Sequence, residues 1–183
     1  MEGSAVAGRA RKSQVAAEIR QTRPFRSVGQ EATIALLRTA SVVNRGLERV
    51  VAPAGLSLAQ YNALRIIRGA GAAGIPTLAI RERMIEEGTT ITRLLDKLED
   101  GGLIRRDRSE PDRRQVICCV TAKGRQLLDG LDPKVDAADE AAVAALTPAQ
   151  QEGLVRLLDL VRRANAERGA PRTLLSRIAR KGA

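Results

Sequence analysis

Apolar residues recur at helical spacing through most of the central part of the chain. From residue 30 to residue 51 they return every three or four positions, which places them on one face of a helix. Pro53 and Gly55 predict the end of that helix. The members of this apolar stripe are Leu36, Ala40, Val43, Leu47 and Val50.

A second helix is predicted by its start signal. Ser57 is a favourable N-cap, and Gln60 can return a hydrogen bond to it in a capping box. Leu56 and Tyr61 have the spacing of a hydrophobic staple across that cap. The apolar positions inside this helix are Leu64 and Ile67.

The Gly and Ala residues at 69–74 predict the end of the second helix and a connection to a third. The third helix is expected to begin near Thr77 and to end at Gly88. The residues expected to face inward from it are Leu78, Met84 and Ile85.

The segment GTTITRLLDKLEDGG, residues 88–102, predicts a fourth helix that is strongly amphipathic. Thr89 can cap its start, and Gly101-Gly102 supplies a left-handed stop. Its apolar face comprises Ile91, Leu94, Leu95 and Leu98. Its outer face comprises Thr90, Arg93, Lys97 and Asp100, with Thr92 and Asp96 on the flanks. Short hydroxyl side chains followed by arginine suit the base edges of a major groove, although any amphipathic helix with a polar outer face has a similar pattern.

Two strand patterns, 103–108 and 113–121, flank the connection Ser109-Glu110-Pro111-Asp112, whose residues favour a turn. Five arginines surround that turn, namely Arg105, Arg106, Arg108, Arg113 and Arg114. A hairpin directly after such a helix is the outline of a winged helix, whose tip can reach a minor groove. The alternative is a solvated hairpin whose charges prevent edge pairing.

The remaining apolar stripes predict two further helices. The fifth begins within 121–131, and Pro133 is expected to kink or interrupt it before 136–146. Thr147 and Gln150 form a second capping box, with Pro148 at the first helical position. The sixth helix carries the apolar residues Leu154, Leu157, Leu158 and Val161. These stripes are compatible with a dimerisation surface or with an intramolecular bundle.

Charge is concentrated at the two ends of the chain. Of the net charge of +10 on 183 residues, residues 1–30 carry +4 and residues 168–183 carry +5, so the middle carries +1. Both ends are rich in Arg, Ala, Gly and Ser, and we expect them to be mostly disordered. The positive charge favours nucleic acid as a partner. Because no membrane span or signal-peptide core is found, we expect a cytoplasmic protein without a membrane partner.

Few residues support catalysis. The absence of histidine excludes His-based triads and His metal sites. Cys118 and Cys119 point to opposite faces of a strand, which predicts small core and surface residues rather than a redox pair. The acids Asp96, Glu99 and Asp100 are expected on a solvated flank with local ion pairs. We therefore predict no enzyme activity and no cofactor.

Four segments in succession are similar to the MarR family of winged-helix transcriptional regulators. They are LSLAQYNALRII (56–67), TRLLDKLEDGGLIRR (92–106), PDRRQV (111–116) and VTAKGRQLL (120–128). The departures are small: VTAKG replaces the more usual Leu-Thr, and Gly101-Gly102 replaces a bulkier first residue.

The resemblance implies a mainly α fold, a winged helix-turn-helix with a small antiparallel β-wing and a helical dimerisation region. It covers about residues 30–167. Within that range it implies a DNA-binding lobe at about 56–121 and dimerisation helices at about 30–52 and 122–167. Outside it lie a disordered basic N-terminal extension, residues 1–29, and a basic C-terminal tail, residues 168–183.

The resemblance also assigns roles to residues. It makes 89–100 the recognition helix and implies that Asp112 orients Arg114 in the wing. The residues expected to contact DNA are Thr89, Thr90, Thr92, Arg93 and Lys97 on the helix, and Arg106, Arg108, Asp112, Arg113 and Arg114 on the wing.

The implied function is that of a homodimer bound to a pseudo-palindromic operator, a repressor released by a small ligand between the DNA lobe and the dimerisation helices. Tyr61, the only tyrosine, is either the staple residue or part of a pocket for a planar aromatic effector. The alternative function is an architectural, nucleoid-type protein that binds DNA non-specifically through its basic tails.

Overall fold

The computed structural model describes residues 14–86, 90–108 and 115–169. Contacts divide the chain into two units, residues 1–138 and residues 139–183. The elements are α1 (Gln14–Glu18), α2 (Val28–Val51), η1 (Ala52–Ala54), α3 (Leu58–Gly69), η2 (Gly71–Ala73), β1 (Ile75–Pro76), α4 (Thr77–Arg83), α5 (Ile91–Asp100), β2 (Ile104–Arg108), β3 (Val116–Val120), α6 (Ala122–Val143) and α7 (Pro148–Gly169).

Helix α2 begins at Val28, two residues before the predicted start at residue 30. The Ser27 hydroxyl caps it by accepting a 3.1 Å hydrogen bond from the Gln30 N–H, and Gly55 ends the following turn at a φ of 75°. The short helix α1 precedes it, so the expectation of disorder is wrong for residues 14–18, while residues 1–13 lie outside the described range. The Glu18 carboxylate fixes α1 by pairing with Arg38 of α2 at 3.2 Å.

The capping box of α3 is confirmed. The Ser57 N–H donates to the Gln60 side chain at 2.8 Å, and the Gln60 N–H donates to the Ser57 hydroxyl at 3.2 Å. The two residues predicted as the staple, Leu56 and Tyr61, are both buried. The start of α3 is therefore set by local sequence.

Helix α4 departs from its predicted packing. It ends at Arg83, and Met84 is buried with an extended ψ of 142°, so Ile85 points away and is 81% exposed. Leu78 is also exposed, because Ile80 holds the core-facing position, and residues two apart lie on opposite sides of a helix. The expectation that Leu78 and Ile85 face inward is wrong, whereas that for Met84 is confirmed.

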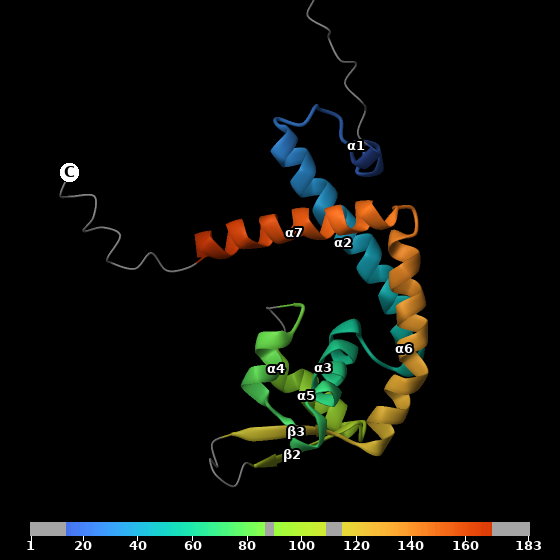
Figure 1. The fold of residues 1–183 in the computed structure, drawn as a ribbon, viewed down its shortest axis with the longest axis vertical. Helices are drawn as coiled ribbons and strands as arrows, with labels where there is room; N and C mark the ends of the chain where they lie inside the picture. The colour runs from blue at the N-terminus through green and yellow to red at the C-terminus, as the bar shows by residue number, and fades with distance from the viewer. Residues whose placement is uncertain (1–13, 87–89, 109–114, 170–183) are drawn as a thin grey trace, which may run out of the picture. The chain divides into compact units, whose positions relative to one another are not determined.

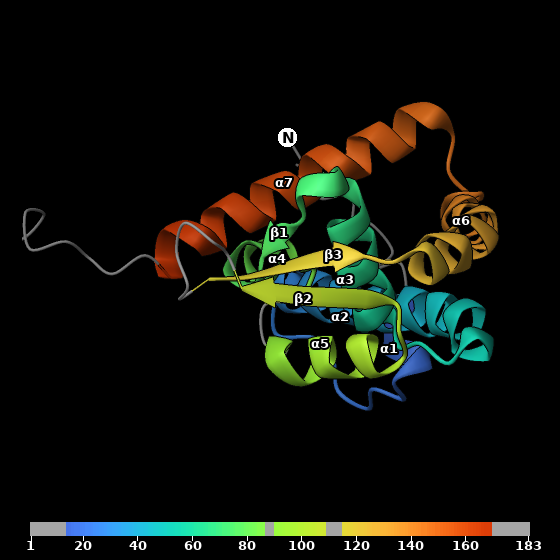
Figure 2. The ribbon, with the colours of Figure 1, turned by 90° about the horizontal axis from the view of Figure 1, so that it is seen from below.

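The wing is a three-stranded antiparallel sheet in the order β1-β3-β2. β2 pairs with β3 from Ile104↔Val120 to Arg108↔Val116, and β1 pairs on the other edge of β3. Helices α3, α4 and α5 lie on one side of the hairpin (Figures 1 and 2). Apolar residues of these helices and strands form the core of the first unit. This arrangement is the predicted winged helix-turn-helix.

Both cysteines of β3 are buried, so the expectation that one of them lies at the surface is wrong. The second face of β3 is covered at Gly74, the residue before β1. A Cβ built on Gly74 would lie 2.5 Å from the Cys119 sulfur, so glycine permits this close approach. The φ of +69° at Gly74 independently favours glycine.

Pro133 was expected to kink or interrupt its helix; α6 runs through it, so the interruption is wrong, while the kink stays a prediction. Leu128, Leu131 and Val135 are buried at spacings of three and four residues, and their apolar face continues across the proline. Burial of these side chains offsets the cost of an internal proline, which is about 3 kcal/mol.

In the second unit, Thr147 and Gln150 form the predicted capping box at the start of α7. The Gln151 side chain donates to the Val143 and Leu146 carbonyl oxygens, which ties α7 to the end of α6. Along α7 a series of apolar side chains is exposed, namely Leu154, Val155, Leu157, Leu160 and Val161. The stripe predicted for this helix is thus present, with most of its surface in contact with solvent.

Candidate DNA-binding surface

Helix α5 presents one face to the core and the other to solvent. Leu94, Leu95 and Leu98 are buried, and Ile91 packs against them, as predicted. The helix ends as predicted at the double glycine, where Gly102 has a φ of +69° and the Leu103 N–H donates to the Leu98 carbonyl oxygen at 2.9 Å. The orientation of α5 is therefore fixed by packing and by its C-terminal cap.

The outer face of α5 holds the predicted recognition residues. Thr92, Arg93 and Lys97 are exposed, and their side chains form no hydrogen bond with another described residue. Thr90 is the N-cap residue, with no side-chain cap bond, instead of a member of the helix proper. Thr89, the predicted cap, lies outside the described residues.

The wing presents two further arginines to solvent. Arg105 and Arg108 of β2 are exposed, and Arg105 pairs with Asp107 on the same outward side of the strand. The predicted tip residues Asp112, Arg113 and Arg114 lie outside the described residues. Their roles at the wing tip stay predictions.

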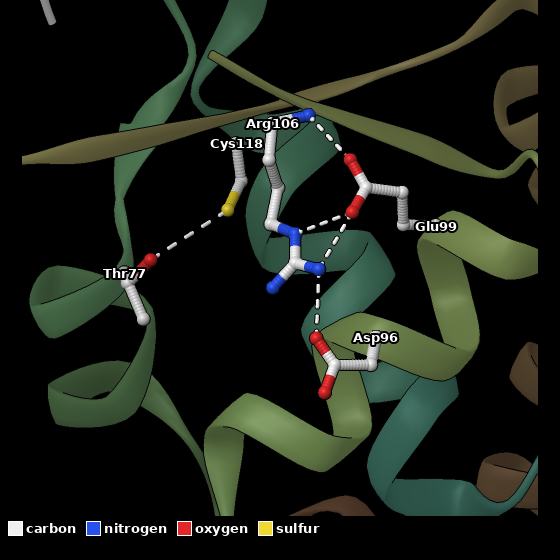
Figure 3. Close-up of polar contacts among 5 residues, drawn as sticks. All are labelled: Thr77, Asp96, Glu99, Arg106 and Cys118. Carbon is white, nitrogen blue, oxygen red and sulfur yellow. Dashed lines mark hydrogen bonds and ion pairs between the residues drawn. The ribbon is translucent and has the colours of Figure 1, made fainter. Parts of the chain in front are cut away.

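Arg106 occupies a different environment from the one predicted. Its guanidinium points at α5 and is bound by two carboxylates, Glu99 Oε2 at 2.7 Å and Asp96 Oδ1 at 2.7 Å (Figure 3). The Arg106 backbone N–H also donates to Glu99 at 3.1 Å. The hydrogen bond that Arg106 donates to Glu99 is the main reason that the pKa of Arg106 is raised. The Arg106 side chain is thus held by α5 and is 24% exposed, and its expected contact with DNA stays a prediction.

Strand alternation explains this placement. Ile104, two residues earlier, is buried against the lobe, so Arg106 lies on the same inward face while Arg105 lies on the outer one. The result is a link between the wing and α5 through Asp96 and Glu99. Both acids were expected on a solvated flank with local ion pairs, but their partner is on another element.

Comparison with known proteins places this arrangement in a family. The model of the MarR family matches residues 56–116. HosA, a transcriptional regulator of Escherichia coli O157:H7, is 31% identical over 103 residues, which are 56% of this chain and 75% of HosA. The chain belongs to the MarR family.

Other members resemble this MarR chain over a greater length. A transcriptional repressor of Mycobacterium tuberculosis is 28% identical over 68% of this chain and 88% of its own. A MarR transcription factor from Planctomyces limnophilus is 35% identical, with a TM-score of 0.58 over 75% of this chain and 99% of its own. Sco3205 from Streptomyces coelicolor, solved in complex with DNA, shares the fold at 20% identity, with a TM-score of 0.69 over 83% of this chain and 94% of its own.

Tyr61 is part of the core of this MarR chain. Its ring is 3% exposed, and its hydroxyl donates to Asp132 Oδ1 of α6 at 2.9 Å. Burial, followed by the hydrogen bond to Asp132, raises the pKa of Tyr61 to about 12. Tyr61 and Leu56 lie in one buried core cluster, as the staple requires. A role for Tyr61 in a ligand pocket stays a prediction.

Asp132 joins the lobe to α6 through a second partner, Arg68 of α3, at 2.5 Å. Burial acts to raise the pKa of Asp132, but the hydrogen bonds from Arg68 and Tyr61 outweigh it and lower the pKa. The only signal in the sequence for this network is the polar residue Arg68 near the end of an otherwise apolar helix face.

Cys118 lies beside the Arg106 cluster with its sulfur 3.9 Å from the Thr77 hydroxyl (Figure 3). Burial raises the pKa of the Cys118 thiol, which disfavours the reactive thiolate. Both cysteines are free, which agrees with their interpretation as packing residues.

In the part of the chain that the structure describes, no helix is long and apolar enough to cross a bilayer. No cluster of Cys, Asp and Glu side chains there has the makings of a metal site.

Proposed function

We propose that this MarR chain is a homodimeric, sequence-specific DNA-binding repressor that a small ligand releases from its operator. The observation that carries the proposal is the exposed row Thr92, Arg93 and Lys97 on a helix that Arg106 joins to the wing. Hydroxyl and guanidinium groups at this position suit base edges in a major groove. Because the helix and wing are joined, they can contact adjacent grooves as one body.

The repressor assignment is supported by the mycobacterial relative, which is a repressor, and by the implication of the family resemblance. A fold shared with Sco3205, which was solved on DNA, is consistent with DNA as partner. A cytoplasmic location follows from this role. Nothing in the described surface calls for catalysis, and we propose no enzyme activity.

The homodimer is supported by apolar surface that the chain itself leaves uncovered. On α7, Leu157 is 63% exposed, and on α2, Leu37 is 65% exposed. Covering such apolar surface with a second copy of the chain removes it from water and so stabilises a dimer. A two-fold dimer presents two recognition helices, so we expect half-sites about one helical turn, roughly 34 Å, apart in a pseudo-palindromic operator.

The experiment that tests the proposal is selection of bound fragments from random DNA, followed by titration of the selected and random sequences. The repressor should prefer its selected site by about 10³-fold or more. An architectural protein acting through basic tails would select no common sequence and show no such preference. Deletion of residues 1–27 should then weaken binding to all DNA similarly and leave the preference intact.

Three variants distinguish major-groove contacts from minor-groove contacts in the same titration. Arg93→Ala should relax the preference at one base position, and Arg114→Ala should cost about 1–3 kcal/mol of operator binding through loss of a minor-groove contact. Asp112→Ala should give a smaller loss of the second kind, because the arginine remains but is no longer oriented. If the Arg114→Ala protein binds the operator as tightly as the parent does, the arginines of the wing do not contact DNA and only keep the edge of the hairpin solvated.

A further inference from the structure

Helix α3 is held at its start by a carboxylate from α2. The Glu48 Oε2 atom accepts a hydrogen bond from the Leu58 N–H, the first amide of α3, at 2.8 Å. An acidic side chain at this point also lies at the positive end of the helix dipole. The capping box serves the amides of Ser57 and Gln60, so Glu48 binds an amide that the capping box does not reach.

A second carboxylate, from α6, holds α3 further along its length. Asp132 accepts a hydrogen bond from the Tyr61 hydroxyl through Oδ1 at 2.9 Å, and one from the Arg68 guanidinium through Oδ2 at 2.5 Å. Tyr61 and Arg68 are seven residues apart, a spacing that places both on one face of a helix. Arg68 also pairs with Asp129, one turn earlier on α6, at 3.5 Å. The two oxygens of one carboxylate therefore fix the position of α6 along α3.

Apolar packing alone does not fix this position. The buried cluster that joins α3 and α6 includes Leu64, Ile67, Leu128 and Leu131. Apolar attraction has no preferred direction, whereas a hydrogen bond weakens steeply as its angle departs from linear. The two carboxylates therefore resist a rotation or a slide of α3 that the apolar cluster would tolerate.

The direction of α3 is passed on to α5. The buried side chains that join these two helices are Leu64, Ile67, Leu94, Leu95 and Leu98. Close-packed side chains transmit a displacement because they leave no free volume to absorb it. A change in the direction of α3 relative to α2 and α6 therefore moves the exposed face of α5.

We infer that Asp132 and Glu48 are positioning residues, which set the direction of α5 relative to α2 and α6. Both act through α3, and neither contacts DNA in the proposed function. In a dimer joined through α2 and α7, the direction of α5 in each chain decides how far apart the two recognition helices lie. The consequence, which rests on the proposed function, is a preference for one spacing between the half-sites of the operator.

The first test needs no DNA. Spin labels are attached at two exposed positions, through Thr39→Cys on α2 and Asp100→Cys on α5, while the buried Cys118 and Cys119 react poorly. Labelled chains are mixed with an excess of unlabelled chains, so that only the distance within one chain is measured. The parent should give one narrow distance distribution, and Asp132→Ala should broaden it and shift its centre. A distribution that Asp132→Ala leaves unchanged would overturn the inference.

Glu48→Ala should give a smaller change of the same kind, because the Glu48 side chain is exposed and water competes for the Leu58 N–H. This variant decides the question if Asp132→Ala does not fold, since removal of an exposed side chain costs little stability. In that case an unchanged distribution in Glu48→Ala would overturn the inference.

Asp136→Ala is the matched control. It removes an exposed carboxylate one turn later on α6, and that side chain forms no hydrogen bond or ion pair with another described residue. The distance distribution should stay that of the parent. A change as large as that of Asp132→Ala would show that loss of charge, and not loss of the contacts with α3, is the cause, and would overturn the inference.

The second test measures the preference for half-site spacing. The operator selected by the parent is rebuilt with its half-sites about two base pairs closer or further apart, and a single half-site is titrated beside it. The parent should bind the rebuilt operators at least about tenfold more weakly than the original, and Asp132→Ala should reduce that ratio to about threefold or less. Single half-site binding should stay the same. A variant that is only less stable binds every DNA more weakly by one factor and keeps the parental ratio, a result that would overturn the inference.

The two tests separate this inference from the proposed function. A parent protein that prefers no sequence and no spacing contradicts the proposed function, while the distance within one chain still decides the positioning role. A parent with a spacing preference that Asp132→Ala and Glu48→Ala both retain contradicts the positioning role alone.

Discussion

At the scale of single residues, two adjacent arginines of β2 have opposite roles. Arg105 points outward, with a side chain 62% exposed, whereas Arg106 points at α5 with 24% exposed. Hydrogen bonds to charged groups with restricted solvent access contribute more to stability than exposed ion pairs do. We therefore assign Arg106 to the coupling of the wing and α5.

Replacing Arg106 by alanine tests that assignment. We expect Arg106→Ala to lower the free energy of unfolding by roughly 1–2 kcal/mol, a figure reduced for the partial exposure of Asp96 and Glu99. It should also weaken operator binding without altering the preferred base sequence, because no base contact is removed. Denaturant titration and binding titration give the two quantities.

The matched control for this prediction is Arg105→Ala, which should change the free energy of unfolding by less than about 0.5 kcal/mol. A double-mutant cycle with Glu99→Ala should give a coupling energy above zero for Arg106 and near zero for Arg105. Similar stability of the two single variants would show that the Arg106 cluster adds nothing to the fold.

Tyr61 offers a second residue-scale prediction, because it is the only tyrosine and the chain has no tryptophan. In the folded protein its phenolate absorbance should appear near pH 12, while in denaturant it should appear near pH 10. The folded state therefore binds the phenol proton more tightly, so stability is fully present below pH 10 and falls as pH rises from 10 to 12.

Asp132→Asn is the diagnostic variant in that titration. It removes the carboxylate charge that raises the pKa of Tyr61, so the folded protein should ionise at a lower pH than the parent does. A parent protein whose tyrosine titrates at pH 10 while still folded would contradict the buried placement of Tyr61.

The sequence predicted individual residues well where one local rule decides and poorly where neighbours decide. The staple pair Leu56 and Tyr61 depends only on the adjacent cap, and it was predicted. The inward position of Arg106 depends on two acids of another element. Strand alternation from Ile104 predicts that Arg106 faces inward, but the usual preference of arginine for solvent predicts the opposite. The sequence alone does not decide between these two rules.

At the scale of elements, the starts of two helices were predicted accurately, whereas the continuation of α6 through Pro133 was not. The capping boxes at Ser57 and Thr147 are satisfied within four residues of chain, so tertiary structure does not change them. Pro133 is a local signal to stop, but the buried face of α6 extends across it. Burial of this face outweighs the tendency of proline to end a helix. The residues next to Pro133 do not show that the face will be buried, so the local sequence does not predict that the helix continues.

Two glycines of α6 give an element-scale prediction with its control on the same helix. A Cβ at Gly124 would lie 2.2 Å from the Leu103 carbonyl oxygen, so the start of α6 can lie against the base of the wing only without a side chain. We expect Gly124→Ala to destabilise the fold by roughly 2 kcal/mol or more, as backbone must move. Denaturation midpoints measure the effect.

Gly130→Ala is the control, and it should stabilise the fold by up to about 1 kcal/mol, because its added Cβ meets no atom within 4 Å. The opposite signs expected for one substitution on one helix separate packing from helix propensity. A gain in stability from Gly124→Ala would show that α6 and the wing are not in close contact at this point.

At the scale of the whole molecule, the sequence predicted the apolar stripes but not what covers them. The apolar stripe of α3 is buried in the core, whereas the apolar stripe of α7 is exposed to solvent at Leu157 and Leu160. Periodicity identifies an apolar face without naming its partner, so an intramolecular bundle and a dimer are equivalent in sequence. The exposure of these α7 side chains is the observation that supports the proposed dimer.

The last prediction concerns the assembly that this exposed surface supports. Sedimentation should show a dimer at low micromolar concentration. Leu157→Glu should shift the protein towards monomer by raising the dissociation constant about 100-fold, since it replaces apolar burial worth roughly 2 kcal/mol and adds a buried charge. Arg163→Glu, on the same helix with an exposed polar side chain, should leave the dimer intact. Because both recognition helices are needed for a full operator, the monomeric variant should protect only one half-site. A parent protein that sediments as a monomer, or a Leu157→Glu protein that stays dimeric, would mean that another surface or no surface joins the chains.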